Sequence, residues 1–185
     1  MPGALALDLS THCGWAYAGP DALAVWPRCG SPLELVAAGP FPAVRSGTWE
    51  LGRSTHGEVA ARFRARLGAF LVEHRPSHLW FERPLVSGQH KGGDAAALAF
   101  GLALIVQEVA VTGRKVFGPV AVQSLHLSTV KKHFTGSGKA KKPDMIAAAQ
   151  ARGWAPTDDN QADALAVLCC GLWGEIERQA KQRVA

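Results

Sequence analysis

One carboxylate in this chain lies inside an otherwise apolar helical stretch, DDNQADALAVLCCGLW, from Asp158 to Trp173. Between Ala162 and Trp173 the only charged residue is Asp163. A helix that is apolar all round packs on more than one side, and an unpaired carboxylate buried there costs several kcal/mol. We therefore expect Asp163 to be protonated, paired with a cation or bound to a metal, and the other acids favour the metal. Asp158 itself is expected to cap the helix.

Two further carboxylates stand at the ends of predicted strands. Residues 4–10, ALALDLS, alternate leucines with smaller or polar residues, which is the period of a strand, and place Asp8 near its carboxyl end. Residues 78–82, HLWFE, form a strand that ends at Glu82, before a proline. Ligands of open α/β sheets gather outside the carboxyl ends of the strands. A helix laid across the sheet could therefore bring Asp163 to Asp8 and Glu82.

The chemistry open to such a group of acids is metal-dependent. Carboxylates that crowd together repel and raise one another's pKa unless a cation lies among them. A site with oxygen ligands alone suits Mg²⁺ or Mn²⁺ and not zinc. A pair of such ions, roughly 4 Å apart, can activate an attacking water and stabilise the leaving oxygen of a phosphodiester. The acids thus predict metal-dependent phosphoryl transfer.

A basic segment, residues 131–142, holds five lysines and one histidine, with no acid. Two glycines make it adaptable, so it suits a phosphate backbone, although a solvated loop is the alternative. It is not a nucleotide-binding P-loop, because His133 stands where that motif needs its first glycine and Ala140 where it needs Ser or Thr. No nucleotide cofactor is expected. The candidate DNA-binding residues are Lys131, Lys132, Lys139, Lys141 and Lys142.

The elements that must position these residues follow from the periodicity of the rest of the chain. We expect strands at residues 4–10, 14–18, 46–51, 78–82 and 115–118, and helices at residues 56–73, 93–112, 123–132, 143–152 and through Asp163. Residues 19–44, rich in Pro, Gly and Ala, are expected to form an irregular insertion with a short helix near residues 33–38. This order predicts a single α/β domain over residues 1–185, with a mixed sheet flanked by helices on both faces.

Composition fits a soluble globular protein of a reducing compartment. Its 48% hydrophobic and 19% charged residues are ordinary, and the net charge of +5 favours an anionic partner where the basic residues cluster. The four cysteines show no CxxC spacing, so we expect reduced thiols in a cytoplasm. The first residues predict a strand and not a signal peptide. The longest uncharged helical run, residues 95–107, is too short to span a bilayer.

Five segments together resemble the RuvC-type Holliday-junction resolvases of the ribonuclease H-like superfamily, particularly their phage-borne branch. They are ALDLSTHCGWA, LWFERP, the Ala-rich helix, VKKHFTGSGKAKKPDMIAAA and DDNQADALAV, of which the last two are the most specific. The resemblance implies a Mg²⁺- or Mn²⁺-dependent endodeoxyribonuclease, with a pair of ions per active site, that resolves four-way DNA junctions by paired cuts. It also implies a homodimer, a role in recombination or repair, and a bacterial or phage-encoded origin. It marks Lys131 and Lys142 as catalytic residues that contact phosphate or stabilise charge.

The resemblance carries a DEDD-type metal site over to Asp8, Glu82 and Asp163. The fourth ligand is open between Asp159 and Asn160, because either spacing places a side chain on the Asp163 face of the helix. Asp159 is favoured, since an Asn oxygen brings no charge to offset divalent ions. If Asp159 instead capped the helix, Asn160 would lie closer to the metal.

Two other functions are alternatives. One is a nuclease of the same fold that acts on other branched DNA or on RNA/DNA hybrids. The other is a catalytically silent junction-binding protein, which the three acids disfavour.

Leu85 departs from the bacterial members of the family, which carry at this position an aromatic residue that unstacks bases. Finally, the helix at residues 95–106 has more apolar surface than a sheet can cover, which predicts a homodimer through Leu98, Phe100 or Leu102.

Overall fold

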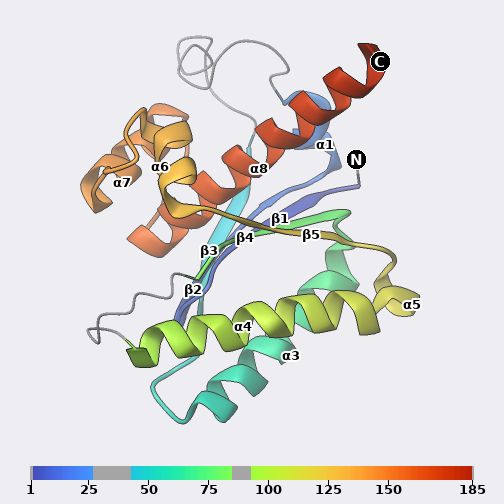
Figure 1. The fold of residues 1–185 in the computed structure, drawn as a ribbon, viewed down its shortest axis with the longest axis vertical. Helices are drawn as coiled ribbons and strands as arrows, with labels where there is room; N and C mark the ends of the chain where they lie inside the picture. The colour runs from blue at the N-terminus through green and yellow to red at the C-terminus, as the bar shows by residue number, and fades with distance from the viewer. Residues whose placement is uncertain (1, 27–42, 85–92, 185) are drawn as a thin grey trace.

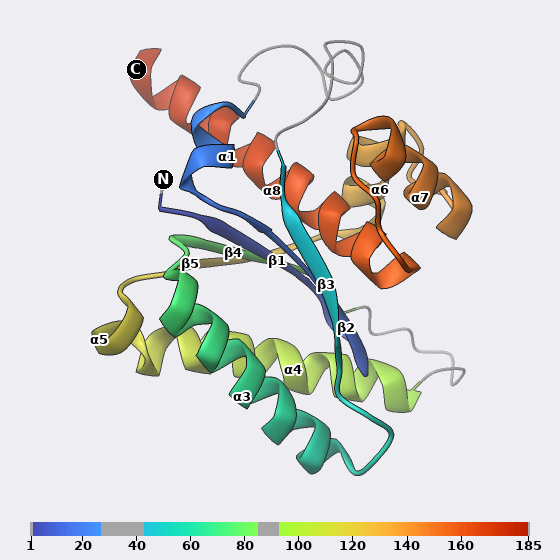
Figure 2. The same ribbon diagram turned by 180° about the vertical axis from the view of Figure 1, so that it is seen from behind.

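A five-stranded mixed sheet separates two layers of helices (Figures 1 and 2). The computed structural model describes residues 2–26, 43–84 and 93–184. The strands lie in the order β3–β2–β1–β4–β5. Their bounds are Ala4–Asp8 for β1, His12–Ala18 for β2, Arg45–Glu50 for β3, His78–Glu82 for β4 and Ala121–Leu125 for β5. This architecture confirms the predicted α/β class.

The carboxyl ends of the parallel strands meet at one edge of the sheet. β1 runs antiparallel to β2, and β2 runs antiparallel to β3. β4 lies parallel to β1, with Phe81 beside Leu7, and β5 lies parallel to β4, with Leu125 beside Glu82. Residues that end β1, β4 and β5 are therefore brought together, although they are far apart in the sequence.

The face of the sheet with the larger side chains is covered by α3, α4 and α5 (Figure 1). These helices span His56–His74, Gly93–Thr112 and Arg114–Phe117. Leu7 and Phe81 from the strands pack in one buried core with Phe63 of α3. α3 begins at a capping box formed by Thr55 and Glu58, which fixes the helix start beside the carboxyl edge of the sheet.

The opposite face is covered by α8, Asp159–Val184, which lies along the sheet (Figure 2). Beside it lie α1, α6 and α7, which span Pro20–Ala24, Leu127–Thr135 and Lys142–Ala151. Ala4 and Ala6 of β1 are fully buried on this face, and their small side chains let α8 approach the sheet closely. A Cβ added at Gly171 of α8 would lie 2.2 Å from the Trp80 ring. α8 therefore rests directly on the strands.

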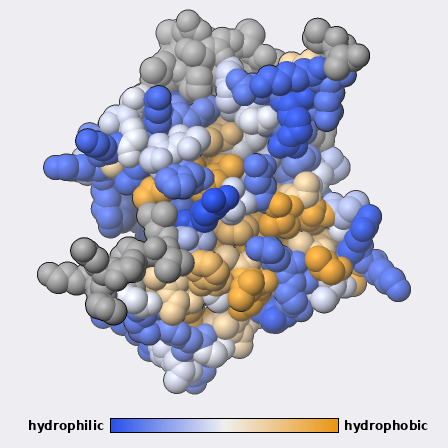
Figure 3. Space-filling view, in the orientation of Figure 1, coloured by the Kyte–Doolittle hydropathy of each residue, from blue (hydrophilic) through white to orange (hydrophobic). Residues whose placement is uncertain are grey.

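By length and composition alone, α4 could cross a membrane. The uncharged run at residues 95–107, which is too short to do so, is only part of this helix. Core helices of soluble proteins pass the same test. In this fold one side of α4 packs in the core, where Leu102 and Val106 are fully buried. The other side carries exposed apolar residues, among them Phe100, Leu104 and Val111, and Figure 3 shows hydrophobic side chains gathered over α4.

The sequence prediction was wrong for residues 113–125. The strand expected at residues 115–118 is the single helical turn α5, and the strand β5 lies at residues 121–125, where a helix was expected to begin. Gly113 and Gly118 flank the turn, and the Phe117 amide donates to the Gly113 carbonyl at 3.1 Å. Short apolar runs of this kind have no decisive period, so pairing with β4 determines which becomes the strand. The helix expected near residues 33–38 lies outside the described residues.

Candidate active site

Strand alternation turns Asp8 and Glu82 toward the same layer of helices. On β1, Leu5 and Leu7 belong to the core beneath α3 and α4, whereas Ala4 and Ala6 belong to the core beneath α8. Asp8 lies two residues after Ala6, so its side chain points to the same face of the sheet as the alanines. On β4, Trp80 faces α8 in the same way, and Glu82 follows it by two residues. Both carboxylates therefore lie on the α8 face at the carboxyl edge of the sheet.

Gly14 lets the start of α8 reach these acids. In the β1–β2 pairing Gly14 lies opposite Asp8. A Cβ at Gly14 would lie 2.0 Å from the carbonyl oxygen of Asn160, so the α8 backbone contacts β2 at a distance that only glycine permits. Asp163, one turn further along α8, is thereby held over the end of β1.

Asp158 caps α8, as predicted. Its Oδ1 accepts a hydrogen bond from the Gln161 backbone amide at 2.8 Å, and its Oδ2 accepts one from the Thr48 hydroxyl at 2.7 Å. The first helical residue is Asp159. Because Asp158 fills the capping position, the Asp159 side chain is free to face the other acids.

The acids interact strongly enough to shift one another's pKa upward. Burial, followed by the charges of Asp163, Glu82 and Asp159, raises the pKa of Asp8 to about 8. Burial and the Asp163 charge raise the pKa of Glu82 to about 7. Burial is also the main reason that the pKa of Asp163 rises to about 6. The structure thus brings together all four acids that the sequence singled out.

Two lysines from the basic segment border this group. The charge of Lys131, on α6, lowers the pKa of both Glu82 and Asp163 against the upward shifts. Lys142, the first residue of α7, forms an ion pair with Asp159. That pair lowers the pKa of Asp159 and raises the pKa of Lys142. Two of the five predicted lysines therefore lie beside the acids.

The remaining lysines lie on the surface. Lys132 is exposed on α6, and Lys139 and Lys141 are exposed on the connection to α7. The Lys141 amide donates to the Asp144 carboxylate at 2.8 Å, which fixes the start of α7. The flexible part of this basic segment is thus shorter than expected, because α6 runs to Thr135 and α7 begins at Lys142, which leaves residues 136–141 as the connection. Leu85, the departure at the wedge position, lies outside the described residues.

The donor set fits a divalent cation. Carboxylate oxygens are the ligands that Mg²⁺ and Mn²⁺ prefer. Burial, with repulsion between neighbouring acids, raises the pKa values of Asp8, Glu82 and Asp163, and a cation among them would favour their ionised forms. Within the described parts of the chain, no three acidic, His or Cys side chains already converge as a coordination sphere. The acids are neighbours whose carboxylates would turn inward onto an ion.

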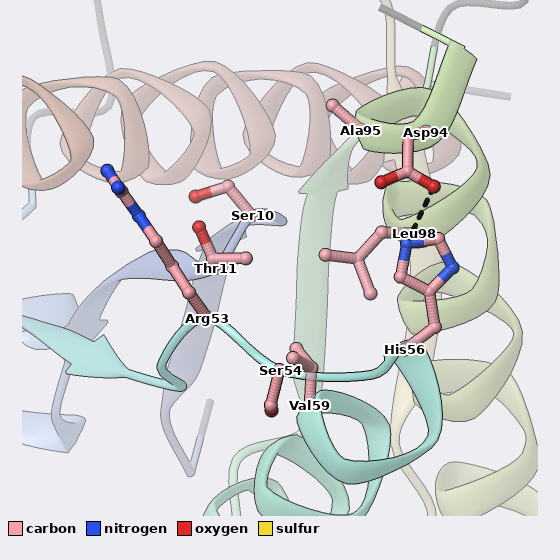
Figure 4. Close-up of a pocket in the computed structure, with 9 residues that line it drawn as sticks. All are labelled: Ser10, Thr11, Arg53, Ser54, His56, Val59, Asp94, Ala95 and Leu98. Atoms are coloured by element: carbon pink, nitrogen blue, oxygen red, sulfur yellow. Dashed lines mark ion pairs between the residues drawn. The ribbon is translucent and has the colours of Figure 1, made fainter.

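A cavity that the sequence did not reveal lies at the same edge of the sheet, on the α3 and α4 side. It has a volume of about 520 Å³ and is lined partly by Ser10 and Thr11, which follow Asp8 in the chain. It is also lined by Arg53 and His56, from the stretch that leads into α3, and by Asp94 of α4 (Figure 4). These residues share no motif or period, so no sequence signal could have grouped them.

Comparison with known proteins identifies the class of fold. No family model and no curated protein matches the sequence. Among solved structures, the chain is similar to Thermus thermophilus RuvC, with a TM-score of 0.58, 19% identity and coverage of 95% of this chain and 96% of that one. RuvC from the same organism in complex with a Holliday junction substrate gives a TM-score of 0.64 at 18% identity, covering 96% of this chain and 97% of that one.

A third solved structure, the yeast mitochondrial Holliday junction resolvase Ydc2, gives a TM-score of 0.61 at 12% identity, covering 97% of this chain and 80% of that one. The chain therefore has a ribonuclease H-like α/β fold. More specifically, this fold is that of the RuvC-type resolvases, which confirms the resemblance at the level of the fold. The phage-borne branch stays a prediction.

Proposed function

We propose that this protein is a metal-dependent endonuclease that resolves four-way DNA junctions. The proposal depends chiefly on one observation, the gathering of Asp8, Glu82 and Asp163 at the carboxyl edge of a RuvC-like sheet. Carboxylates so crowded repel one another when they ionise, and cations among them relieve that repulsion. A solved neighbour of the same fold was obtained in complex with a Holliday junction substrate, which supports the choice of DNA substrate.

Asp8, Glu82, Asp159 and Asp163 would hold Mg²⁺ or Mn²⁺ in this site. When bound, such ions activate a water for attack and stabilise the leaving oxygen of a phosphodiester. The protein's own part is to present deprotonated carboxylates from rigid positions, two at strand ends and two on the first turn or so of α8. Asp159 is the proposed fourth ligand, because Asp158 supplies the helix cap in its place.

Lys131 and Lys142 would bind the oxygens of the phosphate that is cut. The charge of Lys131 already acts on Glu82 and Asp163, and Lys142 pairs with Asp159, so a phosphate drawn to the site would lie between positive and negative groups. Lys132, Lys139 and Lys141 are exposed beside them and would contact neighbouring backbone phosphates. Such contacts position the DNA without reading its sequence.

A homodimer through α4 is part of the proposal, since paired cuts need two active sites. The exposed fractions of Phe100, Leu104 and Val111 are 46%, 61% and 75%. A second copy of the chain would cover this apolar side, which is costly to leave in water. Leu98 and Leu102, the other residues predicted for the contact, are buried in the core and cannot serve.

Cleavage of a panel of labelled substrates tests the proposal. Purified protein with Mg²⁺ should cut a four-way junction by paired incisions, and cut linear duplex, forks and RNA/DNA hybrids far more slowly. Preferred cutting of forks or hybrids would instead support a nuclease of the same fold with another substrate. Tight junction binding without any cleavage in Mg²⁺ or Mn²⁺ would support a catalytically silent junction-binding protein.

A further inference from the structure

The cavity at the carboxyl edge of the sheet is close to the acids but chemically different from them. Ser10 and Thr11 form its near wall and are separated from Asp8 by one and two residues. Asp8 faces α8, whereas the cavity opens on the α3 and α4 side of the same edge. A DNA strand with its scissile phosphate at Asp8 would have its neighbouring nucleotide within reach of this opening.

The walls of the cavity combine a polar rim with an apolar floor (Figure 4). Arg53 and the hydroxyls of Ser10 and Thr11 lie on one side and can donate hydrogen bonds to phosphate oxygens. The floor is made by Val59 and Leu98, which are 1% and 7% exposed. Such a floor suits the flat apolar face of a nucleobase.

An ion pair closes the far side. The Nε2 of His56 lies 3.1 Å from Oδ1 of Asp94, so the pair joins the first turns of α3 and α4 across the cavity. Imidazole and carboxylate groups here can bond to the polar edge of a base that enters between the helices. A cavity of about 520 Å³ lies within the usual range for small-molecule sites.

Other contacts hold the rim in place and leave the side chains that would bind a ligand available. The Leu51 amide donates to the Thr11 carbonyl at 2.9 Å, which ties the β1–β2 turn to the end of β3. Arg62 donates a hydrogen bond to the Ser54 hydroxyl, and the Thr55 capping box fixes the start of α3. A site supported in this way keeps its shape before a ligand arrives.

We propose that this cavity receives an unstacked nucleotide of the DNA strand that is cut, with its phosphate near Arg53 and its base on Val59 and Leu98. The inference rests on the proposed junction-cleaving function and adds a determinant of where the strand is cut. A base inside a continuous duplex cannot enter without being unpaired. Bases at a branch point are already partly unstacked, so the cavity would favour branched DNA and particular bases beside the cut.

A fluorescent base that reports unstacking tests the cavity without cleavage. Four-way junctions with 2-aminopurine at each nucleotide beside the mapped cut are bound to the Asp8→Asn protein. One position should brighten several-fold on binding. Adding Ala95→Trp, whose new side chain fills the cavity from an exposed site on α4, should remove that increase while the junction stays bound. The control is Ala65→Trp, an exposed alanine of α3 outside the cavity.

A second variant tests the cavity independently, in case Ala95→Trp does not fold. Arg53→Ala, at an exposed position, should reduce the fluorescence increase and lower the salt dependence of binding by a slope of about one. Arg66→Ala on the exposed side of α3 is its control. In proteins that cut, Ala95→Trp and Arg53→Ala should also change the preferred bases at the cut.

The outcomes separate the two proposals. If the wild type cuts junctions but both cavity variants match their controls in fluorescence and cut-site preference, the cavity assignment is wrong and the proposed function stands. If the wild type neither binds nor cuts junctions, the proposed function fails and the cavity inference fails with it.

Discussion

At the scale of single residues, the properties of the site come from acids held close together in a poorly hydrated place. The pKa of Asp8 rises from 3.8 to about 8 through burial and the charges of its acidic neighbours. In the folded protein Asp8 thus holds its proton to higher pH than in the unfolded chain. The stability contributed by that proton is complete below about pH 4 and is lost as the pH rises toward 8.

This linkage predicts the effect of Asp8→Asn on stability. In EDTA, the variant should melt higher than the wild type at pH 8 and by a smaller margin at pH 5, because the amide cannot ionise. Mg²⁺ should raise the melting temperature of the wild type more than that of the variant. Calorimetric melting from pH 5 to 8, with and without Mg²⁺, measures both effects. If the difference in melting temperature between Asp8→Asn and the wild type did not change with pH, the assigned environment of Asp8 would be contradicted.

Gly14 predicts a different kind of defect. Gly14→Ala would place a Cβ against the Asn160 carbonyl, so α8 must shift away from β2 and take Asp163 with it. We expect a loss of about 1–3 kcal/mol of unfolding free energy, together with a large loss of cleavage. Gly68→Ala on α3 is the control, because no atom lies within 4 Å of the added Cβ, and it should leave stability unchanged or slightly higher. Chemical denaturation and junction cleavage are the measurements, and equal behaviour of the two variants would contradict the close contact.

The sequence alone was sufficient to predict that these acids lie together, but not which residues position them. Asp163 could be predicted because a charge in an apolar helix needs a partner, and Asp8 and Glu82 because their strands have clear ends. The need for glycine at position 14 depends on a helix that arrives almost 150 residues later in the chain. The cavity beside the site likewise depends on tertiary packing, so neither left a local pattern.

At the scale of elements, the basic segment divides into parts with different roles. Lys131 and Lys142 lie on helices and interact with the acids, whereas Lys139 and Lys141 lie on the connection between α6 and α7. The sequence predicted the charge of this segment and a helix on each side of it, but it ended the first helix at residue 132, whereas α6 runs to Thr135. The same limit explains residues 113–125, where the strand was predicted too early because pairing with β4 is not encoded locally.

The division predicts separable defects. Lys139→Ala combined with Lys141→Ala should weaken junction binding for all sequences and reduce its salt dependence by a slope of roughly one for each phosphate that the protein no longer binds. Lys131→Ala and Lys142→Ala should lower the single-turnover cleavage rate more than the affinity. Binding titrations at several salt concentrations, paired with single-turnover kinetics, distinguish the two groups. An unchanged salt slope in the double variant would mean that residues 136–141 are only a solvated loop.

At the scale of the whole molecule, the two helical layers leave one surface incomplete. The outer side of α4 is exposed and apolar, while its inner side fills the core above the sheet. The sequence predicted the excess of apolar surface but not which residues face outward. The structure selects Phe100 and excludes Leu98 and Leu102.

Phe100→Glu should therefore split the proposed dimer. A charge at this exposed position costs little in the monomer but disfavours an apolar contact between two copies. Sedimentation should show the wild type at twice the 19.6 kDa chain mass and the variant near that mass. Val72→Glu, at a position 48% exposed on α3, is the matched control and should stay dimeric. A wild type that sediments as a monomer at micromolar concentration would contradict the dimer.

The most direct test of the central claim compares binding and cutting by Asp8→Asn on the same four-way junction. The variant keeps the size and hydrogen-bonding capacity of the side chain but removes the charge that would hold Mg²⁺. We predict paired cuts by the wild type in Mg²⁺, none by Asp8→Asn, and junction affinity that is equal to or tighter than that of the wild type. Ordinary turnover of the junction by Asp8→Asn in Mg²⁺ would contradict the account.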